Sequence, residues 1–172
     1  MKKYLFILIT LFVAGYLASK VQSSWGKVRV QSIKIPTQNG QWLVADLFKP
    51  VSANASNPSP LVIVVPGFQR SKETLSNISI ELSRRGIVTI AIDPYAQGLS
   101  SSSFSKRAAT KEGYGMFALV DYVYDTSILN YIDRDKIGVT GHSAGGLAAM
   151  RAAQHFGKLA KKHNTKSKIH SV

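Results

Sequence analysis

The stretch GHSAGG, residues 141–146, holds a serine in a setting that suits nucleophilic chemistry. An apolar run precedes it and an alanine-rich run follows, which indicates a strand, a sharp turn and a helix. Glycines at 141 and 145 would allow so tight a turn. We therefore predict that Ser143 is a nucleophile and that the Ala144 N–H, at the helix N-terminus, is one donor to an oxyanion. The alternative is a glycine-rich turn with an ordinary N-cap serine.

A serine nucleophile needs a base, and the four histidines of the chain do not obviously supply one. His142 adjoins the serine, but adjacent residues in such a turn point apart. His155 lies further along the expected helix, about 18 Å from the serine by helix rise. His163 and His170 fall in the polar stretch beyond that helix, and no acidic residue follows Asp135. Neither a base nor an acid to orient it is visible after the serine.

Hydropathy patterns place this turn in an α/β fold. Two alternating segments indicate a pair of half-buried strands, and three continuous apolar runs indicate strands buried on both faces. The expected strands are 28–35, 41–50, 61–65, 87–92 and 137–141, and the expected helices are 72–85, 113–131 and 144–156. This order predicts a mainly parallel sheet with helices on both faces, preceded by an antiparallel strand pair.

Three loops would meet at the carboxyl edge of the parallel strands, where ligands bind in such sheets. They are PGFQRS (66–71), DPYAQGLSSS (93–102) and GHSAGG. Asp93, in the second loop, could orient a histidine, although a structural role in a turn is favoured. Phe68, Tyr95 and Phe104 could line an apolar site at this edge, or could belong to the core or the surface.

The N-terminus has the pattern of an export signal. Two lysines precede a mostly apolar run, residues 4–18. A helix of that length spans about 23 Å, less than the ~30 Å apolar core of a membrane, and extending it to Val21 takes in Lys20. Residues 1–24 are therefore either a cleaved signal peptide or an uncleaved anchor. We expect an exported protein, either anchored in the membrane through residues 4–21 or secreted or periplasmic.

The chain is basic, with 22 Lys and Arg against 9 Asp and Glu and a net charge of +13. The basic residues are spread along the chain, and Arg-rich motifs with interleaved aromatics are missing, so nucleic acid is not expected as a partner. The local excess after Asp135 favours a solvated helix end, with weak attraction to a membrane surface as the alternative. The absence of cysteine excludes disulfides and thiolate zinc sites.

These motifs, in this order, resemble those of the α/β-hydrolases over residues 28–172. IDRDKIGVTGHSAGG resembles the nucleophile turn of dienelactone-hydrolase-like and cutinase-like esterases and of prolyl-oligopeptidase-type peptidases. PGFQRS resembles the family's oxyanion loop, with Pro66 where many members carry histidine. IDPYAQGLS resembles a loop that shapes the pocket wall, with one glycine of the pattern missing.

The resemblance implies a serine hydrolase that acts on an ester, thioester or peptide bond of a small-molecule or peptide substrate. The reaction would pass through an acyl-enzyme and need no cofactor or metal. The Phe68 N–H would be the second oxyanion donor, with Gln69 as the fallback. The family places its acid and histidine after the nucleophile, so we expect that the sequence is C-terminally truncated and that residues 166–172 lead into the next strand.

We accordingly expect little activity from this chain alone. A non-catalytic remnant or interaction module of the same fold, and a basic domain that binds an anionic surface, are the competing functions.

Overall fold

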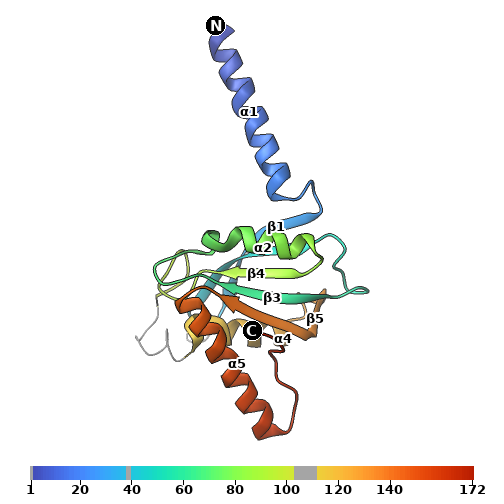
Figure 1. Ribbon diagram of the computed structural model, residues 1–172, viewed down its shortest axis with the longest axis vertical. Helices are drawn as coiled ribbons and strands as arrows, with labels where there is room; N and C mark the ends of the chain where they lie inside the picture. Colours follow the sequence, from blue (N-terminus) through green and yellow to red (C-terminus); the bar gives the residue numbers. More distant parts are fainter. Residues whose placement is uncertain (1, 38–39, 103–111) are drawn as a thin grey trace.

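The computed structural model describes residues 2–37, 40–102 and 112–172, which form an α/β domain with a projecting N-terminal helix (Figure 1). The strands of this part of the chain lie in one sheet of order β1-β2-β4-β3-β5. They are β1 (Val28–Pro36), β2 (Trp42–Pro50), β3 (Ser59–Val65), β4 (Val88–Ile92) and β5 (Ile132–Gly141). The helices are α1 (Lys2–Gln22), α2 (Ser76–Arg84), α4 (Met116–Asp125) and α5 (Ala144–His163), with short 3₁₀ helices η2 (Lys72–Leu75) and η3 (Gly113–Gly115).

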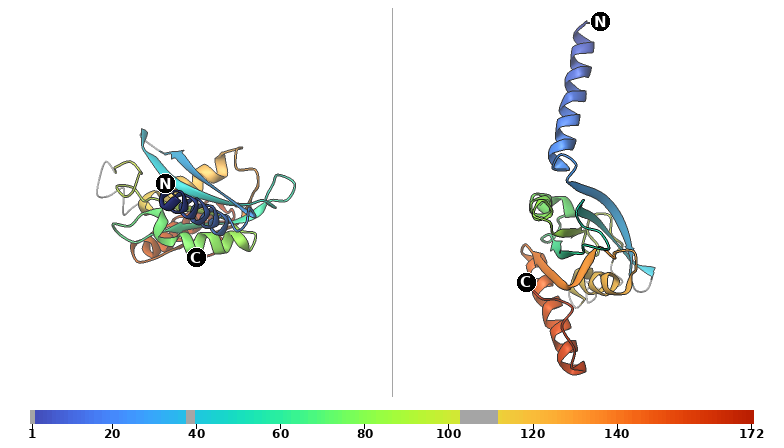
Figure 2. Two further views of the ribbon diagram at one scale, coloured as in Figure 1. Left: turned by 90° about the horizontal axis from the view of Figure 1, so that it is seen from above. Right: turned by 90° about the vertical axis from the view of Figure 1, so that its right-hand side faces the viewer.

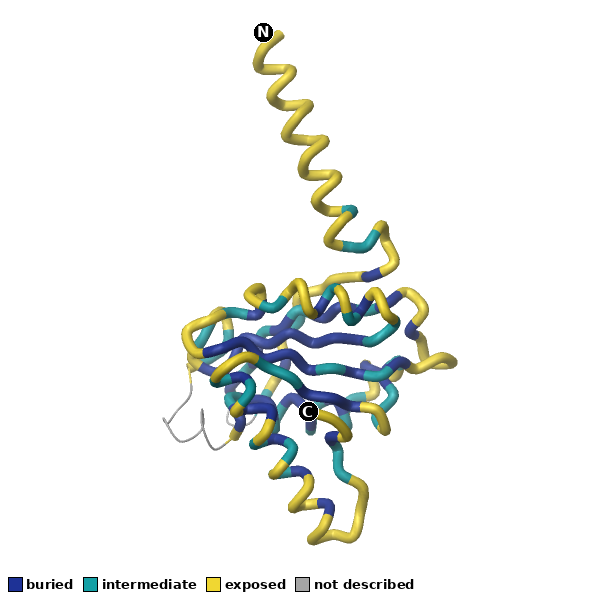
Figure 3. The backbone as a smooth tube through the Cα atoms, in the orientation of Figure 1, coloured by how far each residue is buried: buried dark blue, intermediate teal, exposed yellow. Residues whose placement is uncertain are grey.

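The predicted sheet is confirmed in both its antiparallel and its parallel part. β1 pairs antiparallel with β2, and β2 pairs antiparallel with β4. β3 lies between β4 and β5 and is parallel to both. Of the three apolar runs predicted to be buried on both faces, 137–141 forms the end of β5, where residues 137–139 are buried. The other two are β3 and β4, which form the buried centre of the sheet in Figure 3. Their carboxyl ends, together with that of β5, therefore meet at one edge.

Helices cover both faces of the sheet. α2 packs over a small apolar cluster that includes Val28, Phe48 and Val64. α4 and α5 pack together over the larger cluster on the other face, which includes Leu119 of α4 and Phe156 of α5. Because helices cover both faces, the sheet is held in place, and the loops after β3, β4 and β5 start from fixed positions at its carboxyl edge.

Several element ends differ from the sequence-based expectation. The segment 72–85 begins as the 3₁₀ helix η2 before α2, and α4 ends at Asp125 rather than near residue 131. β5 starts at Ile132, five residues early, with an irregular register against β3. α5 continues to His163, seven residues beyond the expected end, and stops where Asn164 adopts a left-handed conformation.

The last residues of the chain return to the sheet. The Val139 N–H donates to the Ser171 carbonyl at 3.0 Å, and the His170 N–H donates to the Ile137 carbonyl at 2.8 Å. Gly138 and Ser171 form a parallel bridge. Residues 169–171 thus lie alongside β5 in the place of a next parallel strand, as the sequence predicts for the segment 166–172.

The N-terminal helix α1 stands away from the domain. None of its residues is buried, and it is long and apolar enough to cross a membrane by length and composition. It ends close to α2, where an Arg84 guanidinium N–H donates to the Val21 carbonyl at 3.0 Å. Figures 1 and 2 show that α1 and the C-terminal end of α5 point to opposite ends of the molecule.

Candidate functional site

Ser143 occupies the turn between β5 and α5, directly before the first helical residue. Its backbone has φ 53° and ψ −117°, a combination rarely adopted by residues other than glycine. The turn is closed by a hydrogen bond from the Gly145 N–H to the His142 carbonyl at 2.9 Å. Ser143 is exposed, and its hydroxyl has no hydrogen-bond partner among the described residues. The hydroxyl therefore stands free at the positive end of α5.

Glycine is required on both sides of this serine. A Cβ at Gly145 would lie 2.1 Å from the Val65 carbonyl oxygen, and one at Gly141 would lie 2.4 Å from the Gly145 carbonyl carbon. Both positions would be severely overpacked by any side chain. The predicted need for small residues here is confirmed, and the same close packing fixes the start of α5 against the end of β3.

The loop after β3 lies directly against the serine. Gly67 is buried, and a Cβ placed there would be 3.5 Å from the Ser143 Cβ and 3.2 Å from the His142 Nδ1. The Arg70 N–H donates to the Gly67 carbonyl at 3.2 Å, which closes a four-residue turn over 67–70. Gln69, the third residue of this turn, has a positive φ of 55°.

Two backbone N–H groups adjoin Gly67 and Ser143 in the chain, those of Phe68 and Ala144. Phe68, next to Gly67 in the turn, is exposed, and so is the entry to α5 at Ser143. Within the described part of the chain, the N–H groups of Phe68 and Ala144 donate to no protein acceptor. Unpaired N–H groups at such a position can stabilise an oxyanion. An unpartnered hydroxyl and two unpaired N–H groups are thus present, which are some of the groups that acyl transfer would use.

The loop after β4 is held by Asp93, which is fully buried. One carboxylate oxygen accepts the Lys72 N–H at 2.7 Å, and the other accepts the Leu99 N–H at 3.0 Å. The Asp93 carbonyl also accepts the Ser100 hydroxyl at 2.6 Å. With both oxygens engaged inside the protein, Asp93 serves as a structural anchor, the role that the sequence favours, and is not placed to orient a histidine.

The buried ammonium group of Lys72 lies close to Asp93. The Lys72 ammonium lies 3.7 Å from Asp46 and 3.9 Å from Asp93, and it also pairs with Glu73. Burial disfavours the charge on Lys72, but the bond to Glu73 and the charges of Asp46 and Asp93 outweigh it and raise the pKa of Lys72. Hydrogen bonds from Lys72 and Ser71 lower the pKa of Glu73 to about 2.

Three of the four histidines lie away from Ser143, and the ring of the fourth, His142, lies beside Gly67. His155 stacks on Phe117 with the ring centroids 4.3 Å apart, far along α5. His163 is the last residue of that helix. The His170 Nδ1 accepts the Ile137 N–H at 3.4 Å, near the middle of β5. No three His, Cys, Asp or Glu side chains within the described ranges gather in a way that could hold a metal ion.

The three aromatic residues considered for an apolar site have different positions. Tyr95 is only 3% exposed and belongs to the large core cluster, where burial raises the pKa of its hydroxyl. Phe68 is exposed beside Gly67. Phe104 lies outside the described residues. Phe68 is therefore the one aromatic of the three that the structure places at the surface near Ser143.

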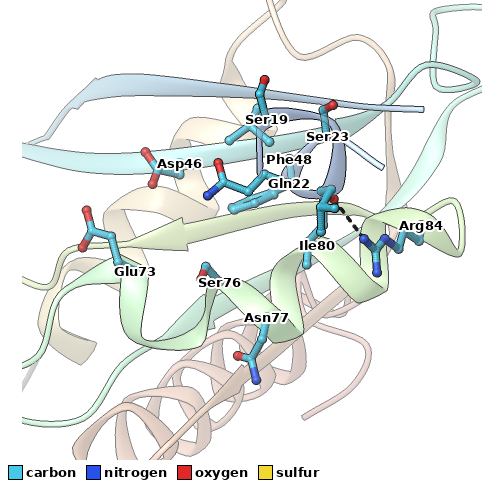
Figure 4. A pocket seen from close by; sticks show the side chains of 12 residues that line it. Ser19, Gln22, Ser23, Asp46, Phe48, Glu73, Ser76, Asn77, Ile80 and Arg84 are labelled. Atoms are coloured by element: carbon cyan, nitrogen blue, oxygen red, sulfur yellow. Dashed lines mark hydrogen bonds between the residues drawn. The ribbon is translucent and has the colours of Figure 1, made fainter. Parts of the chain in front are cut away.

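A large cavity exists elsewhere, between the end of α1, α2 and the first strands (Figure 4). Its volume is about 770 Å³. It is lined by Ser19, Val21, Gln22, Ser23, Val30, Asp46, Phe48, Glu73, Ser76, Asn77, Ile80 and Arg84. None of these residues comes from the turns that hold Ser143 or Phe68, so this cavity is separate from the site built around the serine.

Solved structures with the same fold include several esterases. Est1E from Butyrivibrio proteoclasticus, solved with ferulic acid bound, is 28% identical with a TM-score of 0.60, over 72% of this chain and 47% of that chain. A hypothetical protein of Pseudomonas aeruginosa, PA2218, is 27% identical with a TM-score of 0.60, over 74% and 39%. The Pyrococcus furiosus esterase Pf2001 shares the fold at 22% identity and a TM-score of 0.61, over 78% and 46%.

The chain thus spans less than half the length of each of these structures. No protein of curated function matches it significantly. Residues 15–165, most of the chain, match the PET hydrolase-like family. The parallel sheet, the turn at Ser143 and this match agree, and the chain belongs to the PET hydrolase-like family within the α/β-hydrolase superfamily.

Proposed function

We propose that this chain carries the nucleophile and the oxyanion donors of a serine hydrolase that cleaves an ester bond of a small-molecule or peptide substrate. The observation that carries the proposal is the conformation of Ser143, whose φ of 53° holds an unpartnered hydroxyl at the N-terminus of α5. Such strain in a non-glycine residue is typical of functional sites. Membership of a family of hydrolases supports the same chemistry, and thioester or peptide bonds would react in the same way.

In the proposed reaction the Ser143 Oγ attacks the carbonyl carbon of the ester. An Oγ–C bond forms, the carbonyl oxygen becomes an oxyanion, and the N–H groups of Phe68 and Ala144 donate to it. The C–O bond to the alcohol then breaks, and the alcohol leaves with the proton that the base took from the serine. Water releases the acid from the acyl-enzyme by the reverse sequence. The side chain of Phe68, exposed beside these donors, is suited to contact the substrate.

We infer that the described histidines do not supply the base of this reaction. His155 is occupied with Phe117, and His170 sits beside the middle of β5. Asp93, the acid nearest to the carboxyl edge, has both oxygens engaged. These positions favour, as the second candidate, a non-catalytic domain that keeps the fold and the serine turn. We therefore expect that ester hydrolysis by the 172-residue chain will be no faster than by its Ser143→Ala variant.

A fluorophosphonate probe with added imidazole tests the first candidate. The Ser143 Oγ would displace fluoride from phosphorus, and the serine proton would pass to imidazole, which stands in for the base. Mass spectrometry should locate the adduct on Ser143 of the purified chain, with no adduct in Ser143→Ala. Labelling of other serines at the same rate as Ser143 would refute the hydrolase function, and so would the absence of labelling both with and without imidazole. The non-catalytic domain would then be the remaining candidate.

A thiol variant separates the position of residue 143 from its chemistry. The chain has no cysteine, so Ser143→Cys introduces a unique thiol. The free N–H groups and the dipole at the start of α5 should lower the pKa of this thiol below that of an ordinary cysteine, near 8.5. The pH dependence of iodoacetamide alkylation measures it, and Ser171→Cys, at the edge of the sheet, is the control.

A further inference from the structure

The turn that presents Phe68 is held from outside by the loop after β4. The Arg70 N–H, which closes the turn over 67–70, also donates to the Gln97 side-chain oxygen at 3.1 Å. Gln97 is partly buried and comes from a segment 27 residues further along the chain. This hydrogen bond joins the loop after β3 to the loop after β4 at the point where the turn closes.

Asp93 makes a second connection just beyond the turn. Its carboxylate bridges the Lys72 N–H, two residues after Arg70, and the Leu99 N–H, two residues after Gln97. Gly98 packs against the same carboxylate, because a Cβ there would lie 2.2 Å from the Asp93 Cγ. The two loops are therefore tied to each other at two neighbouring points.

The loop that provides these ties is itself attached to the sheet. The Ser100 hydroxyl accepts the Val44 N–H at 2.8 Å, and the Ser101 hydroxyl accepts the Trp42 N–H at 3.0 Å. Both acceptors thus link the loop to β2, a strand in the interior of the sheet. A support fixed in this way can hold the turn over 67–70 in one place relative to Ser143.

We propose that Gln97 and Asp93 are positioning residues that hold the Phe68 N–H toward the oxyanion, acting through Arg70 and Lys72. On one side of Phe68, the backbone of Gly67 passes beside Ser143, so that a Cβ at residue 67 would reach the Ser143 Cβ at 3.5 Å. On the other side, Arg70 and Lys72 are fixed by the two side chains of the supporting loop. The donor between them is then preorganised and needs no rearrangement when the oxyanion forms. This inference rests on the proposed function of Ser143.

The test uses a matched pair of variants in the whole chain. Gln97→Met keeps the length of the side chain but removes the acceptor, whereas Gln97→Glu keeps an acceptor oxygen. Removing an oxyanion donor slows catalysis by about 10²–10³-fold, so a loosened donor should slow phosphonylation of Ser143 by roughly tenfold. We expect this loss in Gln97→Met and a rate within about twofold of the parent in Gln97→Glu. Asp93→Asn, which replaces one acceptor oxygen by a donor, should slow labelling at least as much.

Two further readouts separate this role from a general loss of structure. Alkylation of the Ser143→Cys thiol by iodoacetamide forms no oxyanion, so adding Gln97→Met should leave its rate unchanged. Amide hydrogen exchange at Arg70, whose N–H donates to the Gln97 side chain, should become faster in Gln97→Met and not in Gln97→Glu. Faster exchange with unchanged phosphonylation would overturn the positioning role, and so would unchanged exchange. If the parent chain is not phosphonylated at all, the proposed function fails, whereas the exchange data still measure the ties.

Discussion

Gly145 of α5 lies against Val65 of β3 so closely that a Cβ at residue 145 would be 2.1 Å from the Val65 carbonyl oxygen. The obstacle is backbone, which cannot swing aside as the end of a side chain can. Helix and strand therefore meet main chain to main chain at this point. Their contact determines how near the start of α5, and with it Ser143, lies to the loop after β3.

Gly145→Ala should therefore destabilise the chain, by about 3 kcal/mol, since overpacking a rigid contact is among the larger effects of single substitutions. Urea unfolding followed by circular dichroism measures the change. Gly157→Ala, on the same helix, has no atom within 4 Å of the added methyl group and should raise stability by about 1 kcal/mol through helix propensity. Equal effects of the two substitutions would show that the contact with Val65 is not tight.

Replacing the serine by glycine should stabilise the fold while removing the chemistry. A non-glycine residue in a strained backbone conformation is disfavoured by about 1–3 kcal/mol, and Ser143→Gly relieves this strain. We expect a gain of about 1 kcal/mol in the free energy of unfolding, together with complete loss of fluorophosphonate labelling. Asn164→Gly, at the left-handed end of α5, should gain less because asparagine tolerates that conformation. A loss of stability in Ser143→Gly would contradict the strain.

The ion cluster around Lys72 should make stability depend on acid pH. The pKa of Glu73 is lowered to about 2 in the folded chain from an ordinary value of 4.5. Its contribution is therefore present above about pH 4.5 and disappears as the pH falls toward 2. Since Glu73 is largely exposed, Glu73→Gln should reduce stability at pH 7 by less than about 1 kcal/mol. Unfolding curves of parent and variant should converge near pH 2.

The pKa of Asp46 is shifted in the direction opposite to that of Glu73. Burial raises the pKa of this carboxyl above its ordinary value of 3.8, against the lowering effect of Lys72. Ionised Asp46 is thus a destabilising group above its folded pKa, and that penalty is relieved as the pH falls through it. The stability difference between the parent and Asp46→Asn should accordingly change with pH in the direction opposite to that seen for Glu73→Gln.

The N-terminal helix should hold the chain in the membrane fraction of cells. At about 1.5 Å per residue, the 21 residues of α1 span roughly 32 Å, enough for the apolar core of a bilayer. An arginine near the centre of such a helix costs about 2.5–3.5 kcal/mol on insertion, so Phe12→Arg should shift the chain to the soluble fraction, and Phe12→Leu should not. Carbonate extraction measures the distribution. The mass of the exported chain separates an anchor from a signal, because cleavage would remove α1.

The sequence predicts the centre of this fold well, because continuous apolar runs leave few alternatives. The apolar runs 61–65 and 87–92 have no polar face, which favours buried strands, and they form the end of β3 and, except for Ile87, β4. The element ends are less predictable. The first half of β5 contains charged residues such as Asp135 and Lys136, so hydropathy does not predict it, and it pairs with β3 only at Ile132, before a register shift. The basic end of α5 is likewise hidden, since a solvated helical turn needs no apolar face.

The candidate site, like the fold, has some features that local sequence pattern predicts and others that it does not. The position of Ser143 between a strand and a helix follows from local pattern, and so does the need for glycine at 141 and 145. The ties made by Asp93 and Gln97 do not, because each joins residues 21 or 27 positions apart. A turn-forming aspartate and a loop glutamine carry no signal of such bonds in a single sequence. Tertiary hydrogen bonds between loops are visible only in the fold.

The direction in which α1 leaves the domain has a consequence for access to the serine. Figure 1 shows α1 projecting from the side of the domain that carries α2, with β3 and β5 running across the direction of α1 and ending where α5 begins. In a chain that keeps α1 inserted in a bilayer, the carboxyl edge of the sheet would then face sideways, along the membrane. A substrate of the proposed hydrolase would then reach Ser143 from the side, through the water next to the bilayer.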